Sequence, residues 1–210
     1  MTEKKRYEIL ESLPAYGPMY VPISENDEQF YSEGFVVKFY KKDGTEWVAN
    51  FKAGWSDFSE IFDYPEKDII VVFANGFGYV MNPNQEKPLM TIGSMSREVF
   101  QSENGDLICI DDIGIEIIDC TNFKTWTSER ISWDGFKDLT FENGIISGKS
   151  FDPTNSKQEW SDFSFNTLTK EIIGGSFREM LKQNSHLEMR NRIEVQLKPE
   201  NEKKWWKIWK

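Results

Sequence analysis

The chain has 210 residues, of which 39% are apolar and 15% aromatic, so its length suits one generous domain or a short array of repeats. Its net charge of −10, from 35 acidic and 25 basic residues, repels phosphate backbones and argues against nucleic-acid binding. Residues 1–10 lack the apolar run of a signal peptide and no stretch reaches the length of a membrane-spanning helix, so we expect a cytoplasmic protein with free thiols at Cys109 and Cys120.

The N-terminal segment, residues 1–18, is expected to form a helical cap. Tyr7, Leu10 and Leu13 follow one another at intervals of three, which is typical of one face of a helix. Pro14 and the Gly-Pro pair after it end the helical pattern. The sequence therefore predicts one short helix before the first strand.

An internal repeat occupies residues 58–133 and dominates the middle of the chain. Three pairs of residues match at a constant offset of 38: Phe62 with Phe100, Asp68 with Asp106, and Gly76 with Gly114. Each copy alternates β-branched runs with turns, and one turn is Asn-Gly, whose residues tolerate a positive φ and favour a hairpin. Each copy is therefore predicted to be a small antiparallel sheet.

Further copies flank this pair. A third copy follows in residues 137–174 and repeats the Asn-Gly turn at Asn143 and Gly144, and a partial copy precedes the pair in residues 34–51. Four strands in a unit of about 40 residues resembles a β-propeller blade, although the Gly-His and Trp-Asp signatures of the best-known blades are absent. The resemblance covers roughly residues 19–176. It implies an all-β, propeller-like fold of about four antiparallel sheet repeats, closed or open, with short helical segments at both ends.

These elements predict a single domain that spans residues 1–210. The helical cap comes first, and the sheet repeats occupy residues 19–175. Residues 176–210 are expected to form a C-terminal helix, a strand and a tail rich in tryptophan. The helix is expected to begin near Phe177.

The tail carries Trp205, Trp206 and Trp209 among lysines. On a helix the three rings would share one side and the lysines would surround it. One interpretation is contact with a membrane or with a partner. The other is a terminal segment whose rings cover an open end of the protein's own core.

Candidate catalytic groups are few. The chain has one histidine, His186, outside the repeats, which argues against a catalytic triad or a histidine-rich metal centre. No glycine-rich phosphate loop is present, and we expect no cofactor and no metal. The carboxylates Asp63 and Glu66 lie near one predicted turn, and Asp111 and Asp112 lie at another. They are interpreted as solvated turn residues that are available to a binding partner.

The leading hypothesis is therefore a non-catalytic module that binds a basic protein, since complementary charge speeds such an encounter. The pattern from Glu129 to Gly135, Glu-Arg-Ile-Ser-Trp-Asp-Gly, is followed by a strand with tryptophan and by Gly-Gly-Ser176. In this it resembles small bacterial proteins without an assigned activity. A concrete form of the hypothesis is an immunity-type protein that inhibits a basic bacterial toxin.

Two alternatives come from other functional classes. A carboxylate-dependent hydrolase or lyase on the sheet scaffold would use Asp63, Asp111 and Asp112. A membrane-surface protein would use the tryptophan and lysine tail, residues 203–210.

Overall fold

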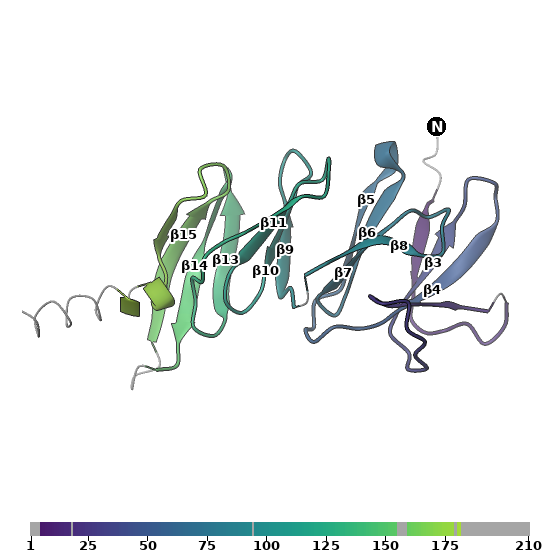
Figure 1. Ribbon diagram of the computed structural model, residues 1–210, viewed down its shortest axis with the longest axis horizontal. Helices are drawn as coiled ribbons and strands as arrows, with labels where there is room; N and C mark the ends of the chain where they lie inside the picture. The colour runs from purple at the N-terminus through teal and green to yellow at the C-terminus, as the bar shows by residue number, and fades with distance from the viewer. Residues whose placement is uncertain (1–4, 18, 94, 155–158, 179, 182–210) are drawn as a thin grey trace, which may run out of the picture. The chain divides into compact units, whose positions relative to one another are not determined.

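The computed structural model describes residues 5–17, 19–93, 95–154, 159–178 and 180–181 (Figure 1). Their strands form four sheets of four strands each, which confirms the predicted all-β fold of about four sheet repeats. The chain divides into two compact units, Met1–Thr127 and Ser128–Lys210. Three sheets belong to the N-terminal unit and the fourth belongs to the C-terminal unit. The single domain and the propeller-like ring stay predictions.

The first sheet has the order β1-β3-β4-β2. Its strands are β1 (Tyr7–Leu10), β2 (Val21–Ile23), β3 (Phe35–Tyr40) and β4 (Glu46–Phe51). β1 pairs antiparallel with β3, β3 pairs antiparallel with β4, and β2 runs parallel to β4. The segment predicted to be a partial copy, residues 34–51, is therefore completed to four strands by residues on its N-terminal side.

β1 shows that the helix predicted for residues 1–18 is wrong in its described part. The periodicity of Tyr7, Leu10 and Leu13 is real, but an isolated helix of about 10 residues is marginal in water. Pairing with β3 satisfies the backbone groups of the segment instead, with Tyr7 opposite Phe39 and Leu10 opposite Val36. The sheet repeats accordingly begin before residue 19, the predicted boundary.

The second and third sheets are the two copies of the repeat. The second comprises β5 (Glu60–Tyr64), β6 (Ile69–Ala74), β7 (Phe77–Met81) and β8 (Pro88–Ile92), and the third comprises β9 (Glu98–Gln101), β10 (Leu107–Ile110), β11 (Ile115–Ile118) and β12 (Thr125–Thr127). Both have their strands in sequence order. The register differs slightly, because Phe62 faces Val71 whereas Phe100 faces Ile108. The two copies therefore share their strand order but not the pairing of individual residues.

The fourth sheet has the order β13-β14-β15-β16. Its strands are β13 (Phe136–Glu142), β14 (Ile145–Asp152), β15 (Glu159–Asn166) and β16 (Ile172–Gly174). Asn143 and Gly144 have φ angles of 51° and 75° and join β13 to β14, as the Asn-Gly pattern predicted. A bulge between Lys137 and Thr140 interrupts β13, and bulges of this kind protect an edge strand from pairing with another chain.

Residues 129–135 contact the start of the helical segment that follows β16, and we call this contact the 129–178 junction. Three interactions form it: the Phe177 amide donates to the Ile131 carbonyl at 3.1 Å, the Trp133 amide donates to the Ser176 hydroxyl at 3.2 Å, and Glu129 pairs with Arg178 at 2.9 Å. The Arg130 guanidinium also lies beside two aromatic rings, 4.9 Å from Trp133 and 5.0 Å from Phe177, and the centroids of these rings are themselves 4.9 Å apart. The Glu-Arg-Ile-Ser-Trp-Asp-Gly pattern therefore has a structural role here.

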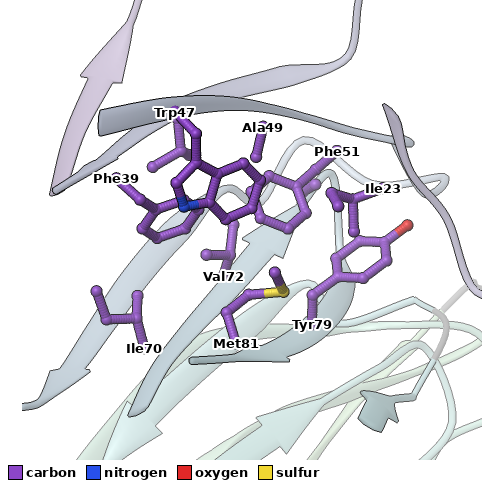
Figure 2. Close-up of a cluster of buried hydrophobic side chains, with 11 residues drawn as sticks. Ile23, Phe39, Trp47, Ala49, Phe51, Ile70, Val72, Tyr79 and Met81 are labelled. Atoms are coloured by element: carbon purple, nitrogen blue, oxygen red, sulfur yellow. The ribbon is translucent and has the colours of Figure 1, made fainter. Parts of the chain in front are cut away.

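The first and second sheets of the N-terminal unit share one hydrophobic core (Figure 2). Phe39 and Trp47 stack with their ring centroids 5.0 Å apart, and Phe51 lies 5.1 Å from Tyr79 of the second sheet. The Trp47 indole N–H donates to the Pro83 carbonyl at 2.8 Å, so its polar atom is satisfied inside the core. Each such ring contributes about 2 kcal/mol through burial. These aromatic side chains therefore serve as core packing.

The second sheet is buried on both faces, because a second core lies between it and the third sheet. Ile70 and Val72 point into the first core, whereas Val71 and Phe73 point into the second, and all four are 0% exposed. This arrangement explains why β6 is a continuous apolar run rather than an alternating one.

Residues 176–178 and 180–181 are helical, which confirms the predicted C-terminal helix over its described length. The predicted strand and tail beyond residue 181 lie outside the described residues. Within the described ranges, no helix is long and apolar enough to cross a membrane.

Candidate functional site

The connection between β5 and β6 carries several charged side chains on a short 3₁₀ turn, η1 (Pro65–Lys67). Proline presets the backbone angle of the first turn residue. Asp68 ends the turn at a φ of 54°, a left-handed conformation that aspartate adopts more readily than most residues. Its amide donates to the Pro65 carbonyl at 3.3 Å. The turn is therefore well defined, and its side chains point to neighbours on two sides.

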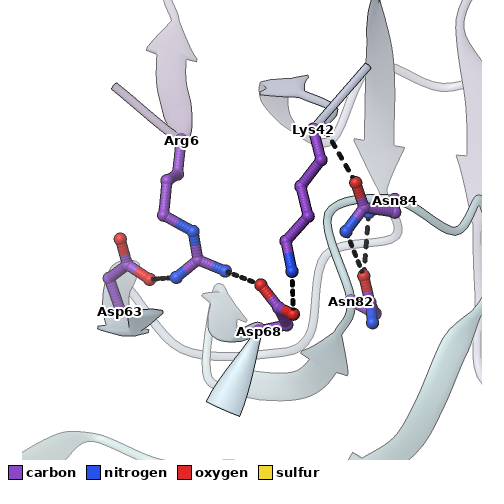
Figure 3. A network of polar contacts seen from close by, with 6 residues as sticks. All are labelled: Arg6, Lys42, Asp63, Asp68, Asn82 and Asn84. Atoms are coloured by element: carbon purple, nitrogen blue, oxygen red, sulfur yellow. Dashed lines mark hydrogen bonds and ion pairs between the residues drawn. The ribbon is translucent and has the colours of Figure 1, made fainter. Parts of the chain in front are cut away.

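On one side, carboxylates of this turn and of the adjacent end of β5 face cations that flank the strands of the first sheet (Figure 3). Arg6 forms an ion pair with Asp63 and lies 3.8 Å from Asp68, which also pairs with Lys42. The Lys42 amide donates to the Asn84 side chain at 2.9 Å. One guanidinium nitrogen of Arg6 is buried without a hydrogen bond, since its carboxylate neighbour is too distant. The charges of this network therefore largely neutralise one another.

An open groove of about 1030 Å³ lies over this network, between the first and second sheets. Four cations and three carboxylates line it: Lys5, Arg6, Lys41, Lys42, Glu8, Asp63 and Asp68. Lys5 pairs with Glu8, and Lys41 pairs with Glu86, so these cations also have partners within the chain. The groove has the volume of a ligand site, but its charged groups are already engaged with one another.

On the other side, the turn contacts the third sheet. The Tyr64 hydroxyl donates to the Gly105 carbonyl at 2.6 Å and accepts from the Gln101 side chain at 3.1 Å. Burial raises the pKa of the Tyr64 hydroxyl to about 12. Lys67 donates to the Cys120 carbonyl at 2.9 Å and contacts the Cys120 thiol at 3.3 Å. The turn therefore links the first, second and third sheets at one end of the N-terminal unit.

Asp106, Asp119 and Cys120 bring three possible metal-ligand atoms within 4.8 Å of one another. Their oxygens have other roles: Asp106 accepts from the Cys120 amide at 3.0 Å, and Asp119 accepts from the Thr121 amide at 2.7 Å. The Lys67 ammonium already contacts the thiol. The turn hydrogen bonds of the two aspartates and the contact of the thiol with the Lys67 ammonium explain why these three residues lie close together.

The remaining predicted carboxylates lie at the β10–β11 hairpin. Asp111 accepts from the amides of Ile113 and Gly114, each at 2.7 Å, and so stabilises the turn. Asp112 accepts two hydrogen bonds from the Arg97 guanidinium, at 2.9 and 2.8 Å. The solvated-turn interpretation is therefore too simple, because both carboxylates have defined partners.

Asp63 lies at the opposite sheet end from Asp111 and Asp112. Asp63 is one residue from the end of β5 beside η1, whereas the other two lie in the turn between β10 and β11. The end that carries η1 contacts the β9–β10 turn through the bond from Tyr64 to Gly105. The three acids of the hydrolase or lyase hypothesis are thus not brought together.

Glu66 differs from the other predicted carboxylates, because it is exposed and pairs with no described residue. Glu103, in the β9–β10 turn at the same end, is also exposed and unpaired among the described residues. Sequence reasoning missed Glu103, as well as the cations Arg6 and Arg97 that neutralise Asp63 and Asp112. Trp205, Trp206 and Trp209 lie outside the described residues.

No protein-family model matches this chain, and no curated protein matches it. Similar solved structures include two computationally designed proteins. One is the Ika4 protein, with a TM-score of 0.39 and 15% identity, over 56% of this chain and 72% of that chain. The other is the Ika8 protein, with a TM-score of 0.39 and 17% identity, over 69% of this chain and 46% of that chain. Likeness at this level carries no conclusion about family or function.

Proposed function

We propose that this protein is a non-catalytic binding module whose acidic surface docks a basic protein. The described residues hold 29 of the 35 acidic residues but 15 of the 25 basic ones, a net charge of −14. An excess of this size attracts a basic partner over a distance of roughly 10 Å at about 0.1 M salt.

The observation that carries the proposal is how the basic side chains are used. Ten of the 15 described lysines and arginines pair with a carboxylate of the chain. Four more contact a backbone carbonyl or an aromatic ring. Contact with a carbonyl or a ring leaves the positive charge of these four side chains in place, so the charge left for a partner is mainly, not wholly, acidic over the described residues.

We place the docking surface at the end of the second and third sheets that carries η1. Glu66 and Glu103 are exposed there and unpaired among the described residues. The bond between Tyr64 and Gly105 holds the two turns together, so the two carboxylates are presented by a fixed backbone. Asp63 and Asp112 contribute less, because Arg6 and Arg97 already neutralise them.

The test is affinity capture of the tagged protein from its native cells, compared with two charge-reversal variants. Wild type is expected to retain one basic protein in equal amount at low salt and to release it at high salt. Glu66→Lys with Glu103→Lys is expected to lose it. Asp57→Lys with Glu60→Lys makes the same change of charge at the other end of the second sheet and is expected to retain it.

Elution of the wild type alone at low salt would contradict the proposal. Equal loss in both variants would show that net charge matters and that the docking surface does not. In a narrower form, we propose that the partner is a basic bacterial toxin and that this protein is its immunity-type inhibitor in the cytoplasm.

A further inference from the structure

The contact between Lys67 and Cys120 joins two sheets of the N-terminal unit through reactive atoms. The Lys67 ammonium donates to the Cys120 carbonyl at 2.9 Å, and this bond holds its nitrogen 3.3 Å from the thiol sulfur. The thiol donates to the Asn104 carbonyl at 3.2 Å, and the Cys120 residue is 5% exposed. The nitrogen and the sulfur are therefore positioned in contact, from residues 53 positions apart in the chain.

We propose that peroxide oxidation joins Lys67 and Cys120 through a covalent nitrogen–sulfur bond. In the first step the Cys120 sulfur attacks hydrogen peroxide, the oxygen–oxygen bond breaks, water leaves, and a sulfenic acid forms. In the second step the Lys67 ammonium releases a proton to water and its lone pair attacks the sulfur. The hydroxyl leaves as a second water and takes one of the two remaining protons of the amine, so the product keeps one N–H. One peroxide is reduced, and the thiol and amine together lose two hydrogens.

The contact geometry favours this product over further oxidation of the sulfur. A sulfenic acid that meets no nucleophile is oxidised onward, whereas one in contact with a thiol or a nitrogen condenses with it. Lys67 already touches the sulfur, so the second step needs no large movement of the chain. A small thiol reductant would reverse the bond, returning the amine and the thiol and forming the disulfide of the reductant.

A disulfide between Cys120 and Cys109 would remove the same two hydrogens, but the sheet keeps these residues apart. Cys109 faces Glu116 across the β10–β11 ladder, and Cys120 lies four positions beyond Glu116. β11 ends at Ile118, but the Cys120 thiol lies beside Gly105, four residues before Cys109. Four residues of extended chain span about 13 Å, roughly twice the Cα separation that a disulfide allows. Cys109 also serves as an internal control, because it is a buried thiol that no described lysine contacts.

The full chain is treated with hydrogen peroxide and analysed by intact mass and by peptide mapping. We expect a loss of two hydrogens, a linked peptide pair containing Lys67 and Cys120, and recovery of the starting mass after thiol treatment. Cys109→Ala retains the mass loss, and so does Lys124→Arg, a matched substitution in the β11–β12 turn. Lys67→Arg abolishes the loss while keeping the positive charge.

Three outcomes would overturn the proposal. One is a mass loss that survives in Lys67→Arg, and another is a mass loss that disappears in Cys109→Ala. The third is wild-type Cys120 that stays a thiol or accumulates as a sulfinic acid, with Lys67 unmodified. Far-ultraviolet circular dichroism of each variant confirms that it is folded. The experiment is independent of any docking partner, so its failure would leave the proposed function standing.

Discussion

Removal of the Tyr64 hydroxyl is expected to change how stability depends on pH. Burial raises the pKa of this hydroxyl from 10.0 to about 12 in the folded protein. The folded state thus holds the phenolic proton more tightly than the unfolded state. The resulting stability is intact below about pH 10 and is lost as the pH rises towards 12. One pKa unit corresponds to about 1.4 kcal/mol, so wild type loses about that much through Tyr64 by about pH 11.

In Tyr64→Phe this loss cannot occur. At about pH 7 the variant is expected to be less stable by about 1–2 kcal/mol, because the Gly105 carbonyl and the Gln101 amide lose a hydrogen-bond partner. By about pH 11 the difference from wild type shrinks by about 1.4 kcal/mol. Other groups that titrate in this range affect both proteins, so they cancel in the comparison.

The assay is urea unfolding followed by far-ultraviolet circular dichroism, at about pH 7 and about pH 11, for wild type and variant. Tyr31→Phe is the matched control, since the Tyr31 side chain is 88% exposed, and its difference from wild type is expected to stay constant. A stability difference for Tyr64→Phe that is the same at both pH values would refute the reasoning.

Three further predictions concern stability and can be measured as urea midpoints. Gly76→Ala is expected to lower the free energy of unfolding by about 3 kcal/mol, because a Cβ there would lie 2.3 Å from the Ser56 hydroxyl. Gly44→Ala is the control: Gly44 also has a positive φ but has open space around it, so the expected loss is about 1 kcal/mol. Equal costs would contradict the clash. Phe73 is 0% exposed, and Phe73→Ala is expected to lower the free energy of unfolding by about 3–5 kcal/mol. Trp55 is 82% exposed, and Trp55→Ala is expected to lower it by less than about 0.5 kcal/mol. Similar losses at the two sites would disprove the assigned core. Arg6→Met is expected to cost about 2 kcal/mol, since two carboxylates lose their guanidinium neighbour, and an unchanged midpoint would show the network to be irrelevant to stability.

Local patterns predicted the sheets well, because hairpins are built from neighbours in sequence. The Asn-Gly turn at Asn75 and Gly76 joins β6 to β7 with φ angles of 49° and 86°, as its residue types require. β1 was missed for the opposite reason. Its partner β3 lies about 30 residues away, and a segment of four residues carries too little periodicity to reveal that pairing.

The candidate site was predicted only in part, because ion pairs are set by the fold. The sequence predicted Asp63 and Asp112 to be solvated carboxylates, but the fold places an arginine against each of them. Arg6 is 57 positions from Asp63, and no spacing rule joins them. Glu66 was identified because its turn was recognisable from Pro65, whereas Glu103 needed the contact between two turns to stand out.

The 129–178 junction also determines how the C-terminal unit would bear mechanical load. The chain enters the fourth sheet and leaves it at the same place, where the Phe177 amide bonds to the Ile131 carbonyl and Glu129 pairs with Arg178. Tension along the chain would therefore pass through the junction and bypass the ladders between β13 and β16. These few bonds, together with the Arg130 side chain beside the Trp133 and Phe177 rings, would act as a mechanical clasp. The strands would begin to peel apart only after the clasp had opened.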